Sequence, residues 1–207
     1  MAHHYTLDQM DWKSIMRDAN VTPKGVCHVG AHEGQEVALY QELGFHSIIL
    51  VEADPNLAAD LQAKYNHVNG IAVLPFAAGS DRGIAGFHRV LRDQQYNSLL
   101  EPIQLGNVQK FEVPVWPLRK WINVGNDDPT NVLVIDTQGS ELQVLEGADL
   151  RDIEMIVIEV GTKAKYDGQP MREDVEFYMQ SNGWRMVHEW PHGPRAIWFD
   201  QVYVKRG

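Results

Sequence analysis

Glycine and acidic residues at the ends of two apolar segments have the spacing that chemistry at a bound cofactor requires. Residues 25–31 form an apolar segment that runs into Gly30 and Gly34, and residues 47–51 form a second one that ends at Glu52. A glycine turn after a strand lets a ligand approach backbone N–H groups, and an acid after the next strand accepts hydrogen bonds from ribose hydroxyls. This order predicts a site for an adenosine-containing cofactor.

The spacing of the glycines distinguishes between such cofactors. Dinucleotide-binding turns follow the pattern G-x-G-x-x-G, in which the middle glycine lets a pyrophosphate lie against the backbone. In this chain His32 stands at that middle position, between Gly30 and Gly34. Its side chain would obstruct a pyrophosphate, whereas S-adenosylmethionine has no phosphate. The spacing therefore favours S-adenosylmethionine and methyl transfer over a dinucleotide and hydride transfer.

Two further acids lie in predicted core strands. Asp136 follows the apolar residues 132–135, and Glu159 lies within the apolar segment 156–160. Burying a carboxylate is costly unless it is paired or hydrogen-bonded, so acids in such segments are often functional. Asp136 could accept the amino group of the cofactor, act as general base toward a substrate hydroxyl, or cap the next helix. Glu159 is a second candidate base.

Small and polar side chains near predicted strand ends complete the candidate site. Ala53 follows the second strand, and Ala77 and Ala78 end the third, where small side chains would admit a purine ring. Asn97 and Ser98 could hydrogen-bond a substrate, although residues of these types more commonly form turns. The single cysteine allows no CxxC pair to accompany the histidines, so no metal site of the zinc type is predicted.

The composition restricts the partners and the location that we expect. The chain has 207 residues and a formal net charge of -10, without a run of Lys or Arg. Long nucleic acids and anionic membranes bind through basic clusters, so a small-molecule or carbohydrate acceptor is favoured. There is no signal pattern and no apolar run of the roughly 20 residues that a membrane span needs, and one cysteine allows no intrachain disulfide. We therefore expect a cytoplasmic protein.

Apolar periodicity predicts an α/β fold with a mostly parallel sheet. The predicted core strands are 25–31, 47–54, 71–78, 131–136 and 155–160. The predicted helices are 35–43, 55–65, 140–146 and 172–181. Residues 184–190 and 196–205 alternate between apolar and polar side chains and predict an antiparallel hairpin that closes the sheet. This apolar hairpin could also form the interface of a homo-oligomer.

Residues 1–207 are predicted to form a single domain with two additions to the core. Residues 1–24 lead into the core with a short helix over 6–20. Residues 81–130 form an insertion rich in Gly, Asp and Asn, which contains two alternating segments, 84–90 and 111–118. Loops at strand ends are where substrate sites are usually built, so the insertion is expected on the substrate side.

Four sequence blocks resemble the FkbM-type family of S-adenosylmethionine-dependent O-methyltransferases, over residues from about 25 to 184. The blocks are HVGAHEGQE at 28–36, VEADP at 51–55, DTQGSELQVLEGA at 136–148 and IEV at 158–160. The third block is the most specific. The first two are shared with many class I methyltransferases.

The resemblance implies a Rossmann-like, seven-stranded sheet whose last strand is antiparallel. It also implies a site acid at Asp136. The family often has an acid at the position of His28 that helps to hold the cofactor's ammonium group, so Asp136 would carry more of that task here. The cofactor contacts that it implies are Gly30, Ala31, His32, Gly34 and Glu52.

Three functions follow from these patterns. The favoured one is an O-methyltransferase that acts on a hydroxyl of a small molecule or sugar. A dinucleotide-dependent oxidoreductase would have the same order of strand, turn, strand and acid, but this chain lacks the middle glycine of the dinucleotide pattern. A non-catalytic cofactor-binding module would keep the fold without needing the acids at Asp136 and Glu159.

Overall fold

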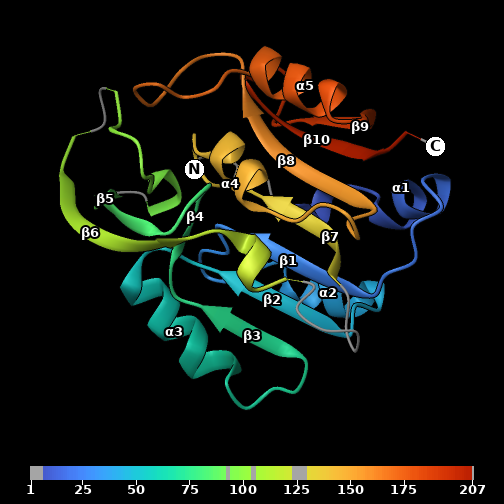
Figure 1. The fold of residues 1–207 in the computed structure, drawn as a ribbon, viewed down its shortest axis with the longest axis horizontal. Coiled ribbons are helices and arrows are strands. Elements are labelled where there is room, and N and C mark those ends of the chain that lie inside the picture. The colour runs from blue at the N-terminus through green and yellow to red at the C-terminus, as the bar shows by residue number, and fades with distance from the viewer. Residues whose placement is uncertain (1–6, 92–93, 104–105, 123–129, 207) are drawn as a thin grey trace.

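A computed structural model of the chain describes residues 7–91, 94–103, 106–122 and 130–206 (Figure 1). Seven strands form the main sheet: β1 (Gly25–Val29), β2 (Ser47–Val51), β3 (Ile71–Leu74), β7 (Thr130–Ile135), β8 (Met155–Gly161), β9 (Trp184–Pro191) and β10 (Trp198–Lys205). Their order is β3-β2-β1-β7-β8-β10-β9, which runs from bottom to top in Figure 1.

The strand directions confirm the predicted sheet. Strands β1, β2, β3, β7 and β8 are parallel to their neighbours in this set. Strand β10 is antiparallel to both β8 and β9. The main sheet is therefore mostly parallel and ends in the antiparallel hairpin that the alternation in the last segments predicts.

Local sequence sets the helix boundaries. The helices are α1 (Trp12–Asp18), α2 (Val37–Leu43), α3 (Pro55–Tyr65), α4 (Glu141–Gly147) and α5 (Arg172–Ser181). Helix α3 begins where the Asp54 side chain accepts a hydrogen bond from the N–H of Asn56, with Pro55 in the first turn. Helix α2 ends at Gly44, whose φ of 92° is left-handed. The predicted helix over 6–20 is wrong in extent: a 3₁₀ turn over Leu7–Gln9 precedes the shorter α1.

Alternating side chains of the central strands build a core on each face of the sheet. Val132 and Val134 of β7 pack with residues of α1 and α2, whereas Leu133 and Ile135 pack with residues of α4 and α5. All six residues of β7 are buried. Burial of each such aliphatic side chain stabilises the fold by roughly 1.5 to 3 kcal/mol. The strand ends that carry polar residues are thus held on a rigid central element.

A second, three-stranded sheet contains β4 (Ala77–Ala78), β5 (Gly83–Val90) and β6 (Val108–Trp116), in the order β4-β6-β5. The prediction of one strand over 71–78 is wrong, because β3 ends before Pro75 and β4 pairs with β6 instead. Proline has no N–H for the ladder of the main sheet. In Figure 1 the second sheet lies on the side to which the arrowheads of β1, β2 and β3 point.

No helix in the described part of the chain is both long and apolar enough to span a membrane.

The turn after β1 depends on Gly30, which packs directly against the end of β7. The φ of Gly30 is +85°, in the left-handed region that favours glycine. A Cβ atom at this position would lie 1.8 Å from the backbone carbonyl oxygen of Asp136. This close contact brings the ends of the two strands together.

Replacing Gly30 with alanine is expected to lower the free energy of unfolding by roughly 2 to 5 kcal/mol, through backbone strain and overpacking. Gly86→Ala is the control, because nothing lies within 4 Å of its added Cβ. Its expected effect is within about 0.5 kcal/mol. Chemical denaturation measures both. Equal stabilities for the two variants would contradict the close packing described for Gly30.

Candidate functional site

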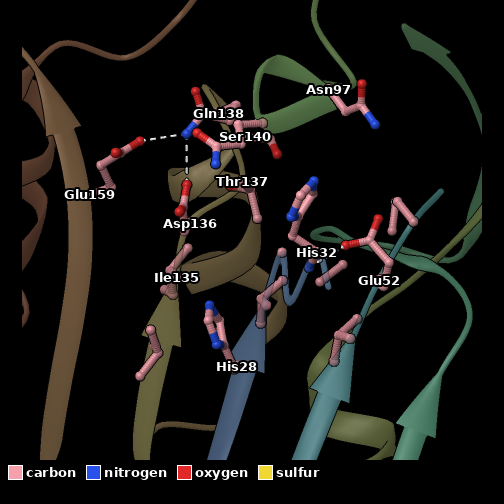
Figure 2. Close-up of a pocket in the computed structure, with 18 of the residues that line it drawn as sticks. His28, His32, Glu52, Asn97, Ile135, Asp136, Thr137, Gln138, Ser140 and Glu159 are labelled. Atoms are coloured by element: carbon pink, nitrogen blue, oxygen red, sulfur yellow. Dashed lines mark hydrogen bonds between the residues drawn. The ribbon is translucent and has the colours of Figure 1, made fainter. Parts of the chain in front are cut away.

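A cavity of about 330 Å³ opens at the carboxyl ends of β1, β2, β7 and β8 (Figure 2). Strand β1 lies between β2 and β7, and the chain reverses its winding direction there. Ligands of doubly wound α/β folds bind at this kind of switch point. Nine residues predicted from the sequence line the cavity: Gly30, His32, Glu52, Ala53, Ala77, Ala78, Asn97, Asp136 and Glu159.

Glu52 and the glycine turn form one wall of the cavity. One carboxylate oxygen of Glu52 accepts the backbone N–H of His32 at 2.8 Å, and the other accepts that of Asp54 at 2.7 Å. His32 has a φ of +49°, a left-handed conformation within the turn. Burial raises the pKa of Glu52 to about 7. Each carboxylate oxygen has a further lone-pair site, so Glu52 can still accept a ligand hydroxyl.

Three predicted site residues are not among the described residues that line the cavity. Ala31 is fully buried, and its N–H donates to the carbonyl of Val51. A Cβ atom at Gly34 would meet Leu61, on the helix side of the turn. The Ser98 hydroxyl donates to the backbone carbonyl of Gln138 at 2.7 Å and so supports the turn after β7.

An ion pair that sequence reasoning missed attaches the second sheet to the end of β2. The Arg89 guanidinium of β5 donates to both carboxylate oxygens of the fully buried Asp54. Asn97 donates to Asp54 at 3.2 Å and accepts the N–H of Val90 at 2.9 Å. Because 35 positions separate Asp54 from Arg89, no local pattern could reveal the pair. Asn97 thus lines the cavity while its side chain joins two protein segments.

The acids of β7 and β8 are linked through a single amide. The side-chain nitrogen of Gln138 donates to Asp136 at 2.7 Å and to Glu159 at 2.6 Å, as Figure 2 shows. Burial raises the pKa of both carboxyl groups, and the charge of Asp136 raises that of Glu159 further. Of the two carboxyl groups, Glu159 therefore holds its proton more strongly. Asp136 does not cap α4, whose N-cap residue is Ser140.

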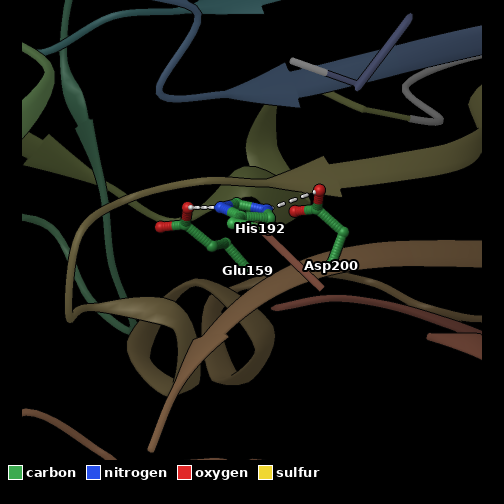
Figure 3. A group of neighbouring side chains, drawn as sticks. All are labelled: Glu159, His192 and Asp200. Carbon is green, nitrogen blue, oxygen red and sulfur yellow. Dashed lines mark hydrogen bonds and ion pairs between the residues drawn. The ribbon is translucent and has the colours of Figure 1, made fainter. Parts of the chain in front are cut away.

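His192 lies between two carboxylates at the same end of the cavity (Figure 3). Its Nε2 is 2.9 Å from Asp200, and its Nδ1 is 3.6 Å from Glu159. The antiparallel register places Asp200 of β10 opposite Glu159 of β8. Burial by itself would lower the pKa of His192, but the hydrogen bond and charge of Asp200 raise it. One ligand atom from each of the three residues lies within 4.8 Å of the others, a spacing that could also hold a metal ion.

Glu36 and His28 are buried cavity residues with unpaired atoms. The Oε2 of Glu36 and the Nε2 of His28 have no hydrogen-bond partner among the described residues. The Nδ1 of His28 is 3.0 Å from the Tyr40 hydroxyl and 3.9 Å from the Oε2 of Glu36. Burial lowers the pKa of His28 to about 4, and burial raises that of Glu36 to about 7. Near neutral pH His28 is uncharged, so it does not balance the charge of Glu36.

The doubly wound sheet with a cavity at its switch point places the chain in the class of Rossmann-like α/β proteins. Residues 28–186 match the methyltransferase FkbM domain, and the chain belongs to this family. The resemblance in the four sequence blocks is thereby confirmed. No curated protein matches the chain.

Solved methyltransferase structures share the fold at low sequence identity. A methyltransferase FkbM from Methylobacillus flagellatus KT superposes with a TM-score of 0.59 at 21% identity, over 88% of this chain and 44% of that one. This chain therefore spans less than half of that relative. A proposed RNA methyltransferase from Pyrococcus horikoshii gives 0.53 at 11% identity, over 93% and 78%. A proposed tRNA (m1A22) methyltransferase from Streptococcus pneumoniae, in complex with S-adenosyl-L-methionine, gives 0.50 at 16%, over 95% and 73%.

Replacing Glu36 with glutamine is expected to stabilise the ligand-free protein at pH 8 by roughly 1 to 3 kcal/mol. Folding raises the pKa of Glu36 from 4.5 to about 7, so the folded state favours the protonated carboxyl group. Relative to the variant, the wild type therefore loses stability as the pH rises from 4.5 to about 7.

Denaturation at pH 4 and at pH 8 measures this difference. Glu33→Gln is the control, because Glu33 lies in the same turn but is exposed. A stability difference between wild type and Glu36→Gln that does not change with pH would show that the carboxyl group of Glu36 folds without a rise in its pKa.

Proposed function

We propose that the protein is an S-adenosylmethionine-dependent O-methyltransferase that acts on a hydroxyl group of a small molecule or carbohydrate. Membership of the FkbM family supports methyl transfer. The observation that carries the proposal is the distribution of groups in one cavity. Glu52 and small side chains lie at the end of β2, and a cluster of carboxyl and imidazole groups lies at the ends of β7 and β8.

The cavity residues fit this cofactor. Glu52 would accept the ribose hydroxyls, and Ala53, Ala77 and Ala78 would leave room for the adenine ring. Three strand spacings separate β2 from β8, or roughly 14 Å, which suits an elongated ligand. In the part of the chain that the structure describes, no donor reaches the buried Oε2 of Glu36, as expected where a ligand supplies one. When bound, S-adenosylmethionine supplies an electrophilic methyl group.

The chain's own residues would orient the acceptor and remove its proton. Asp136 and Glu159, the bases predicted from the sequence, share the Gln138 amide and lie next to His192. We propose that Nδ1 of His192 receives the proton of the acceptor hydroxyl, because Asp200 accepts a hydrogen bond from Nε2–H and would stabilise the imidazolium that forms. The carboxyl groups of Asp136 and Glu159 would then act on the pKa of the His192 ring through their charge.

A small acceptor fits the charge of the cavity better than RNA does. Two of the structural neighbours are proposed RNA or tRNA methyltransferases, but at 11% and 16% identity they share only the fold. Nucleic acids bind through basic surfaces, whereas the net charge of this chain is -10. The carboxyl groups of Glu36, Glu52, Asp136, Glu159 and Asp200 all line the cavity.

Calorimetric titration with S-adenosylhomocysteine and with NAD+ tests the cofactor. We expect micromolar binding of S-adenosylhomocysteine, no NAD+ signal, and at least about 50-fold weaker binding after Glu52→Ala, because two hydroxyl acceptors are lost. Asp60→Asn, an exposed change on α3, serves as control. Binding of NAD+ alone would instead indicate an oxidoreductase. Cofactor binding without turnover of any hydroxylated acceptor would indicate a non-catalytic module.

With an acceptor found by screening, His192→Gln is expected to lower kcat by about 100-fold or more and to leave the affinity for S-adenosylhomocysteine within about twofold. Asp200→Asn should shift the acidic limb of the pH profile to lower pH, since Asp200 raises the pKa of His192. His67→Gln, at an exposed histidine, is the control. An unchanged kcat in His192→Gln would transfer the role of base to Asp136 or Glu159.

A further inference from the structure

Glu36 is a cavity residue to which the proposed proton transfer gives no role. It directly precedes α2, only 6% of its surface is exposed, and it lines the cavity. Its Oε2 has no hydrogen-bond partner among the described residues. Buried acceptors in folded proteins are nearly always paired, so an unpaired carboxylate oxygen in a cavity indicates that a ligand supplies the donor.

The groups that face Glu36 do not balance its charge. His28 of β1 is uncharged near neutral pH, and Tyr40 of α2 is a neutral phenol. Among the described residues, the charges that raise the pKa of Glu36 are those of three acids, Asp8, Asp136 and Asp200. A cation is therefore the partner that would best stabilise the ionised carboxylate of Glu36 in these surroundings.

The cations that line the cavity are already engaged elsewhere. The Lys165 ammonium lies over the ring of Tyr96 at 4.2 Å and over that of Trp198 at 5.1 Å. His192 lies between Glu159 and Asp200. A cation that pairs with Glu36 would therefore come from the ligand.

We infer that Glu36 binds the α-ammonium group of the methionine moiety of S-adenosylmethionine, in a subsite that His28 and Asp136 complete. This inference rests on the proposed function and adds the residue that recognises the amino-acid end of the cofactor. A primary ammonium has three N–H donors and one charge, which suits a single unpaired carboxylate oxygen. The buried Nε2 of His28 can accept a further hydrogen bond in one of its tautomers.

Three probes separate the parts of the ligand. S-adenosylhomocysteine carries both the ammonium and the carboxylate, S-adenosyl-3-thiopropylamine keeps only the ammonium, and 5′-methylthioadenosine has neither. Calorimetry on Glu36→Gln is expected to show about 10- to 100-fold weaker binding of the first two probes, because a hydrogen bond between charged groups is lost. Binding of 5′-methylthioadenosine should stay within about twofold of wild type. The exposed Glu33→Gln should change none of the three affinities.

A second variant tests whether the negative charge of Glu36 causes the affinity for the two ammonium probes. The Nδ1 of His28 lies only 3.9 Å from the Oε2 of Glu36, so an acid at position 28 would reach the same subsite. His28→Asp combined with Glu36→Gln should recover at least about fivefold of the lost affinity for the two ammonium probes. No recovery would contradict the inference.

The remaining outcomes are distinguishable. If wild type binds none of the three probes, the proposed function is wrong and the inference falls with it. If wild type binds S-adenosylhomocysteine and Glu36→Gln binds it equally well, only the inference is overturned. A loss in Glu36→Gln that is equally large for 5′-methylthioadenosine would show that Glu36 supports the structure of the cavity, and would also overturn the inference.

Discussion

The burial of several carboxyl groups at the ends of parallel strands is the physical constraint on which this structure depends. Each group would be unstable as an isolated charge in a dry environment. Glu52 is stabilised by backbone N–H groups, Asp136 and Glu159 by the Gln138 amide, and Asp200 by an imidazole. These partners come from turns and strand ends. Stabilisation of the buried carboxyl groups therefore depends on the turns after β1 and β7 and on the register of β10. Glu36 differs because its Oε2 has no such partner among the described residues.

Much of the architecture could be predicted because its signals are local. Apolar runs mark the central strands, the Gly44 and Pro55 positions set helix ends, and the alternation after residue 184 marks the final hairpin. The carboxyl ends of parallel strands meet at one edge of a sheet, so acids and glycines at strand ends predict cavity residues well. Glu52 and Asp136 illustrate this, since both follow apolar runs and both line the cavity.

Pairings between distant segments could not be predicted. The position of Asp200 beside Glu159 depends on the antiparallel register of β10, which residue alternation alone does not determine. The ion pair between Asp54 and Arg89 depends on how the second sheet packs against β2. The predicted strand over 71–78 failed for a local reason, because Pro75 interrupts the hydrogen-bond ladder and allows the chain to enter another sheet.

Asp54 performs two structural tasks at once, because it caps α3 and binds the guanidinium of Arg89. The wall beside Glu52 and the attachment of the second sheet therefore share one side chain. Sequence changes elsewhere in β5 and β6 would leave this attachment in place as long as Arg89 is kept. In evolutionary terms, an exchange of the second sheet would have to keep a cation at the position of Arg89, because Asp54 would otherwise be a buried charge without compensation.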